Sequence, residues 1–152
     1  MSKLDKKAHQ MYNQILNKVV EPMVGDDITY QDGLDKAGNN MFCRRFKGVF
    51  ASDKIPRLND LKKYAILNLD RSNEQGSHWI AIAFENGKTY VYDSFGRKSS
   101  RIIPTLFHSG NGRIMDADYD SEQKIKENNC GARSLAWLLF FDRYGANMAM
   151  RI

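Results

Sequence analysis

The spacing of apolar residues near the start of the chain predicts an amphipathic helix over residues 3–20. The apolar positions recur at steps of three or four, with charged and amide side chains between them: Leu4, Ala8, Met11, Ile15, Leu16 and Val19. Such spacing places them on one face of a helix. Ser2 is a suitable N-cap, because its hydroxyl can accept a hydrogen bond from the first turn. Glu21-Pro22 and Gly25 are expected to end the helix.

The middle of the chain has the pattern of a β-sheet. Residues 25–41 are rich in aspartate, glycine and asparagine and are expected to form a loop, with a short strand near residues 28–30. Short apolar runs at 46–50 and 64–69 predict strands. His78–Phe84 and Thr89–Tyr92 predict two more, joined through Asn86-Gly87, which favours a hairpin because both positions tolerate φ > 0.

The C-terminal part predicts a buried helix over Cys130–Tyr144. This apolar run is longer than an ordinary strand, and Gly145 follows it in the place of a C′ glycine. Residues 101–107 are ambiguous because Pro104 interrupts them, and residues 109–119 fit a loop or a short strand. The expected fold is therefore α+β, a mainly antiparallel central sheet flanked by helices, with the helix that begins at Cys130 packed on it.

Composition narrows the class of protein. The chain has 152 residues, of which 42% are hydrophobic and 27% charged, so residues 1–152 fit one domain with a core. The net charge of +5 is compatible with an acidic partner without requiring one. Two cysteines exclude a disulfide framework and a zinc site of four thiolates. Neither a signal peptide nor a spanning stretch of about 18 apolar residues is recognisable, so we expect a protein that is neither secreted nor membrane-spanning.

Four polar residues could carry chemistry. In a hairpin, the start of one strand lies opposite the end of the next, so His78 and Asp93 are expected to be neighbours. Cys130 begins a helix, where unpaired N–H groups favour the thiolate. Gln123 could donate to a developing oxyanion beside the N–H of Cys130. Taken singly, these residues fit simpler roles, such as a buried thiol, an ordinary histidine and a turn-forming aspartate.

In this order the residues resemble a family. His78-Trp79, then Asp93 in an apolar-Asp-Ser-Phe-Gly turn, then Gln123, then Cys130-Gly131, resemble the adenovirus-type and Ulp-type (adenain/Ulp-like) cysteine peptidases. Upstream, Phe46–Pro56, Tyr64–Asp70 and Gly76–Trp79 look like the segment before the catalytic histidine in proteases of adenoviruses, virophages and Maverick/Polinton elements. The similarity covers roughly residues 42–145, the expected catalytic core.

The resemblance implies a papain-like fold and a role for each matching residue. Cys130 would be the nucleophile, His78 the general base and then acid, and Asp93 the residue that orients the histidine. Gln123 and the N–H of Cys130 would form the oxyanion hole. Trp79 and Gly131 would contact substrate. Alternatively, Trp79 is simply an aromatic residue of the core or of its rim.

The resemblance also implies a substrate and a location. The protein would be an endopeptidase that cleaves viral capsid precursors after small, often glycine, residues, as a monomer in the virion or infected cell. The same scaffold serves isopeptidases of ubiquitin-like modifiers, which the sequence does not separate from it. No cofactor is required by the sequence. Adenovirus-type proteases use DNA, so DNA or peptide activation stays open, although activator sites in their C-terminal extension have no counterpart here.

Two other classes compete with the peptidase. Five acidic residues follow a calcium-loop spacing, but Ser121 stands where that loop needs glycine, so we interpret the run as a solvated loop: Asp116, Asp118, Asp120, Glu122 and Glu127. Basic clusters interleaved with aromatics would suit a nucleic-acid module, although charge runs are usually solvated faces: Arg44-Arg45-Lys47, Arg57/Lys62/Lys63 and Arg97-Lys98-Arg101. Cys43 is expected to be a buried structural thiol, and both cysteines to be reduced.

Overall fold

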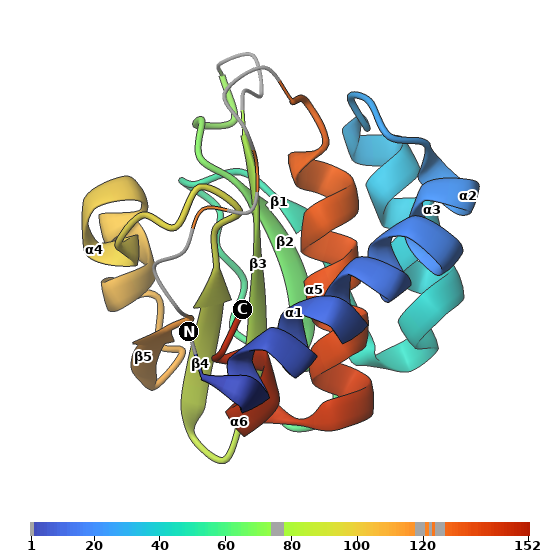
Figure 1. Ribbon diagram of the computed structural model, residues 1–152. Coiled ribbons are helices and arrows are strands. Elements are labelled where there is room, and N and C mark those ends of the chain that lie inside the picture. Colours follow the sequence, from blue (N-terminus) through green and yellow to red (C-terminus); the bar gives the residue numbers. More distant parts are fainter. Residues whose placement is uncertain (1, 74–77, 118–120, 122, 124–126) are drawn as a thin grey trace.

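The computed structural model describes residues 2–73, 78–117, 121, 123 and 127–152 (Figure 1). Within these residues, five strands form one mixed sheet in the order β1-β2-β3-β4-β5. Their bounds are β1 Phe46–Phe50, β2 Tyr64–Asn68, β3 Trp79–Glu85, β4 Lys88–Tyr92 and β5 Arg113–Asp116. Helices cover both faces of the sheet, so the α+β class is confirmed.

The expectation of a mainly antiparallel sheet is wrong at its edges. The central strands β2, β3 and β4 are antiparallel neighbours, but β1 pairs parallel with β2, and β5 pairs parallel with β4. A tight hairpin fixes the direction of its second strand, whereas the edge strands are reached through longer connections that leave the direction open. The expected antiparallel pairing therefore holds only where the turns are short.

The predicted hairpin is confirmed in its details. Glu85 pairs with Lys88, so only Asn86 and Gly87 lie in the turn. Both have positive φ, 53° and 75°. Two left-handed residues give a turn whose twist matches that of the flanking strands. The turn thereby fixes the register that brings the beginning of β3 near the end of β4.

The N-terminal helix begins as predicted but continues beyond residue 20. Ser2 Oγ accepts a hydrogen bond from the N–H of Asp5, whose carboxylate accepts one from Ser2, so a capping box starts α1 (Lys3–Ile15). A π-helical turn follows over Leu16–Val20 and then α2 (Glu21–Val24). Because Pro22 lacks an N–H, the regular ladder cannot pass through it. The π-helical turn accommodates the missing hydrogen bond, and Gly25 at φ 86° ends α2.

Residues 31–42 form a helix, α3 (Gln31–Phe42), where the sequence predicted a loop. Its buried side includes Leu34, Ala37 and Phe42. Gly38, which weakens helix propensity, lies against the ring of Phe46, and a Cβ there would come within 2.3 Å of that ring. Tertiary packing on β1 thus overrides the glycine-rich composition. No strand forms at residues 28–30.

The predicted C-terminal helix is confirmed as α5 (Cys130–Tyr144), ended by Gly145 at φ 86°. It packs against β3 beneath α1 and α3, on the right-hand side of the sheet in Figure 1. The Trp137 ring stacks on that of Tyr92 at 5.5 Å within this core. A smaller core on the other face lies under α4 (Ser99–Ile102) and a 3₁₀ turn over Pro104–His108. A short α6 (Ala146–Ala149) follows α5.

Candidate active site

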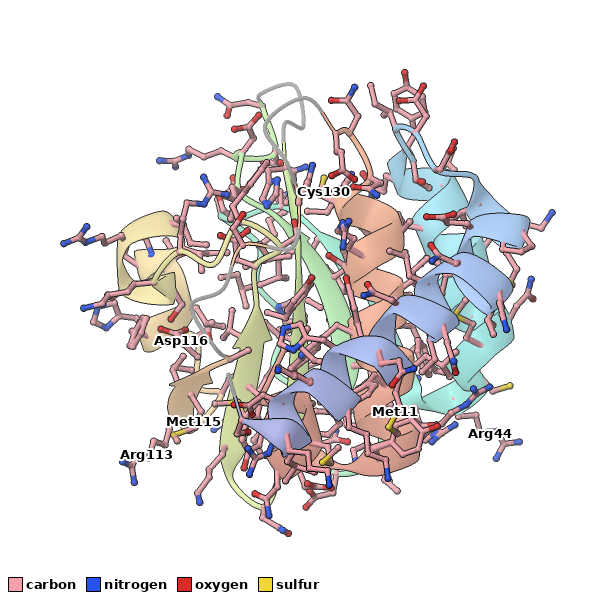
Figure 2. The ribbon with its side chains drawn as sticks, viewed as in Figure 1. Met11, Arg44, Arg113, Met115, Asp116 and Cys130 are labelled. Carbon is pink, nitrogen blue, oxygen red and sulfur yellow. The ribbon has the colours of Figure 1, made fainter. Side chains whose placement is uncertain are left out.

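The candidate nucleophile lies at the first residue of α5. Figure 2 shows Cys130 at the upper end of this helix, and the residue is only 8% exposed. The N–H groups of a first helical turn have no partners within the helix. The Cys130 sulfur also accepts a hydrogen bond from the main-chain N–H of Trp79, at 3.4 Å. Both features stabilise a thiolate at this position.

His78 and Asp93 are neighbours, as the hairpin argument predicts. His78 precedes β3, Asp93 follows β4, and His78 Nε2 lies 2.7 Å from Asp93 Oδ1. Both residues are buried. The carboxylate fixes Nε2 as the protonated nitrogen, which leaves Nδ1 for the other side of the ring. The His78 ring also interacts with the Cys130 thiol. One imidazole therefore links the thiol to the carboxylate.

Hydrogen bonding shifts the pKa of each partner. Burial lowers the pKa of His78, but its hydrogen bonds to Asp93 and Cys130 outweigh burial and raise it above its ordinary value. Burial raises the pKa of the Cys130 thiol, but hydrogen bonds from His78 and from the Trp79 N–H lower it overall. The two shifts favour the same state, a thiolate beside an imidazolium.

The acidic residue is held by a second cation that the sequence reading did not identify. Arg97 Nε donates to Asp93 Oδ2 at 2.8 Å, and the Arg97 main-chain N–H donates to the same oxygen at 3.1 Å. Burial raises the pKa of Asp93, yet the hydrogen bonds from His78 and Arg97 hold it well below its usual range. Phe95 stacks on the His78 ring at 4.9 Å, and Arg97 lies over Phe95. These contacts fix the tilt of the imidazole.

Gln123 is buried, and both ends of its side-chain amide are engaged. Oε1 accepts a hydrogen bond from Ser94 Oγ at 2.6 Å, and Nε2 donates to the carbonyl of Glu127. The Ser94 contact fixes which end of the amide is the nitrogen. The amide nitrogen carries two hydrogens, of which the Glu127 carbonyl takes one. Asn129 also carries a side-chain amide next to the nucleophile, and it occupies the N-cap position of α5 without capping the helix through its side chain.

The two residues expected to contact substrate flank the thiol. Trp79 is half-buried, and its indole N–H donates to the carbonyl of Thr29 at 3.1 Å. Gly131 is buried, and a Cβ there would lie 3.0 Å from Leu34 and 3.3 Å from Thr29. The missing side chain therefore lets the segment before α3 approach the start of α5. The short strand predicted near residues 28–30 gave no indication of this contact.

Other sequence-based expectations have different outcomes. Cys43 is exposed rather than buried: it directly follows the last residue of α3, where the chain leaves the helix with φ 53°. Cys43 and Cys130 are free thiols. Most of the calcium-loop positions, Asp118, Asp120 and Glu122, lie outside the described residues, and no cluster of three or more potential metal ligands occurs within them.

The basic clusters do not gather in one place, and Arg97 from one of them contacts Asp93 in the candidate site. Figure 2 shows Arg44 far from Cys130, at the other end of the molecule. Arg45 pairs with Asp142, and Lys63 with Glu85. In the part of the chain that the structure describes, no helix has the length and apolar character needed to cross a membrane. A comparison with known protein families finds no match, and none of the curated proteins matches the chain.

Proposed function

We propose that this protein is a cysteine endopeptidase that uses a Cys130–His78–Asp93 triad. The observation that carries the proposal is the arrangement of three buried groups: a thiol at a helix N-terminus, an imidazole that interacts with it, and a carboxylate that is hydrogen-bonded to the imidazole. A nucleophile, its base and the group that orients the base are the parts that covalent acyl transfer needs. The sequence resemblance to adenovirus-type and Ulp-type peptidases supports the same reading.

The chemistry follows from the proton positions. The Cys130 thiolate attacks the substrate carbonyl carbon, and the carbonyl electron pair moves onto oxygen. The His78 imidazolium then gives its proton to the leaving amine, the C–N bond breaks, and a thioester remains on Cys130. His78, now neutral, takes a proton from water as the water attacks the thioester, and the acid product leaves with the thiolate restored. Asp93 stabilises the imidazolium in both halves.

The oxyanion needs donors near the nucleophile. The main-chain N–H of Cys130 supplies one, since first-turn N–H groups are free of intrahelical partners. The second N–H of the Gln123 amide supplies the other in our proposal. The Ser94 and Glu127 hydrogen bonds hold this amide in one orientation before substrate binds. Such preorganisation is where oxyanion stabilisation gains its strength.

The decisive experiment removes the sulfur. Cys130→Ala should abolish cleavage of a fluorogenic peptide that ends in Gly-Gly before a coumarin leaving group, because no other atom can form the thioester. Stability should change little, since the lost atom is small and lies at a helix end. Cys43→Ala is the matched control and should keep parental turnover, because Cys43 is exposed on another helix. Turnover in Cys130→Ala would refute the nucleophile assignment.

The substrate class rests on the sequence resemblance. We propose cleavage of viral structural precursors after small residues, at sites where a narrow channel excludes side chains. Incubating the protein with candidate capsid precursors and sequencing the new N-termini tests this directly. Release of a ubiquitin-like modifier from a lysine side chain, with precursors left intact, would instead indicate an isopeptidase.

A further inference from the structure

A buried arginine lies in the helix of the candidate nucleophile. Arg133 is in the first turn of α5 after Cys130 and is only 8% exposed. Arginine is almost never this buried unless its charge and its donors are partnered. Keeping it there is costly, and replacing a buried ion pair by apolar side chains is often neutral or stabilising. Its partners therefore indicate what the charge is used for.

The guanidinium binds the segment that leads into the nucleophile. Arg133 Nε donates to Asn129 Oδ1 at 3.2 Å, and Nη2 donates to Glu127 Oε2 at 3.3 Å. Asn129 Nδ2 donates to the same Glu127 oxygen at 3.3 Å. These contacts form a closed ring of three side chains from residues 127, 129 and 133. The ring explains why the Asn129 side chain does not cap α5.

Both proposed oxyanion donors are connected to residues of this ring. Asn129 directly precedes Cys130, so its position sets where the Cys130 N–H points. The Glu127 carbonyl accepts the hydrogen bond from Gln123 Nε2, so the position of Glu127 sets where the Gln123 amide points. The Arg133 guanidinium thus holds Asn129 and Glu127, and these two residues position the two oxyanion donors.

The ring is anchored from the far side by the N-terminal helix. Arg133 Nη1 lies 3.5 Å from the hydroxyl of Tyr12 on α1, and the Tyr12 and Tyr92 hydroxyls are 2.8 Å apart. Tyr12 and Tyr92 are fully buried. The guanidinium is therefore fixed between α1, β4 and the 127–129 segment, and it cannot follow that segment if the segment moves.

We propose that Arg133 is a positioning residue that aligns the oxyanion hole by holding Asn129 and Glu127. The inference rests on the proposed peptidase function and assigns to Arg133 no contact with substrate. The alternative is a purely structural role, in which Arg133 stabilises the fold and leaves the reaction unaffected. The two roles predict different results for a variant without Arg133: only the positioning role predicts a loss of oxyanion stabilisation while the reactivity of the Cys130 thiol is kept.

The test separates thiol reactivity from oxyanion stabilisation. Iodoacetamide reacts with a thiolate by displacement at carbon and forms no oxyanion, whereas a peptide aldehyde ending in Gly-Gly captures the thiolate as a tetrahedral adduct that needs the oxyanion donors. In Arg133→Met, kcat on the coumarin peptide should fall by about 10²-fold, the usual scale for misplaced catalytic groups, with KM nearly unchanged. Aldehyde affinity should fall in parallel, while alkylation of Cys130 keeps the parental rate.

Two further variants complete the design. Glu127→Ala keeps the buried arginine but removes one of its partners. It should lower kcat by about 10-fold, again with unchanged alkylation of Cys130. This variant provides the test if Arg133→Met does not fold. Arg143→Met, at the exposed end of α5, is the matched control and should be unchanged.

Each outcome has one meaning. Parental kcat in a folded Arg133→Met and in Glu127→Ala overturns the inference, as does an equal loss of alkylation and turnover. If the parental protein alkylates at Cys130 but never cleaves a peptide or binds the aldehyde, the proposed function itself fails, and the inference fails with it.

Discussion

Asp93 accepts hydrogen bonds from two cationic side chains, and this sharing predicts how activity depends on pH. Activity should be lost on the acid side as the Cys130 thiolate is protonated, and on the alkaline side as the His78 imidazolium loses its proton. The Asp93 carboxylate stabilises the imidazolium. Asp93→Asn should therefore lower the His78 pKa and move the alkaline limb of kcat/KM to lower pH, as measured over a pH series.

Arg97 supplies the opposite change for comparison. Its guanidinium offsets the negative charge of Asp93 that His78 experiences. Arg97→Gln should therefore raise the His78 pKa and move the alkaline limb to higher pH. Shifts of the two variants in the same direction would contradict this account of the triad.

Gln123 gives a second prediction for a single residue. Removing one oxyanion donor usually costs about 10²–10³ in rate, so Gln123→Ala should lower kcat by that factor with a smaller effect on KM. Iodoacetamide alkylation of Cys130 should stay nearly normal, because activation by His78 does not pass through Gln123. Ser94→Ala, which frees only the far end of the amide, should show a smaller loss. Parental kcat in Gln123→Ala would assign the donor to another group.

Part of the candidate site could be predicted from sequence, and the rest depends on side-chain direction. A two-residue turn fixes strand register, so the proximity of His78 and Asp93 followed from residues 86 and 87 alone. The hold of Arg97 on Asp93 did not, because it depends on how the chain bends after β4. The ring around Arg133 joins residues more than 100 positions from Tyr12, and no local pattern reports such contacts.

At the scale of elements, α3 shows how packing can override composition, and Gly38 makes this measurable. Gly38→Ala gains about 1 kcal/mol of helix propensity, but its Cβ would come within 2.3 Å of the buried Phe46 ring. Overpacking of this kind costs typically about 1–3 kcal/mol, and a contact at several ring carbons lies at the upper end. We therefore expect a net loss of about 1–2 kcal/mol in unfolding free energy, measured by urea denaturation.

Gly33→Ala is the matched control on the same helix. Its Cβ would meet only Thr29 Cγ2, at 3.2 Å, so the gain in propensity should be largely retained. If Gly38→Ala were as stable as Gly33→Ala, the packing of α3 on β1 would not be the reason that these glycines differ. The sequence alone could not distinguish these two glycines. Both weaken the helix, but only Gly38 permits a close contact with β1, the strand that follows α3.

At the scale of the whole molecule, one core joins both ends of the chain to the candidate site. Trp137 stacks on Tyr92, contacts Phe141, and donates its indole N–H to the carbonyl of Ala149 near the C-terminus. The same core cluster includes residues of α1, α3 and the sheet. Elements that share one core are expected to unfold together. The elements around the candidate active site should therefore unfold together with the rest of the molecule, in a single transition.

Trp137→Phe tests this unity, because it leaves Trp79 as the remaining tryptophan, beside the candidate site. The smaller ring leaves a cavity and deprives the Ala149 carbonyl of its donor, so we expect a loss of about 2–4 kcal/mol in unfolding free energy. Urea unfolding followed by Trp79 fluorescence should coincide with unfolding followed by far-ultraviolet circular dichroism. An earlier fluorescence transition would mean that the site opens before the core, and that the triad is held by local contacts alone.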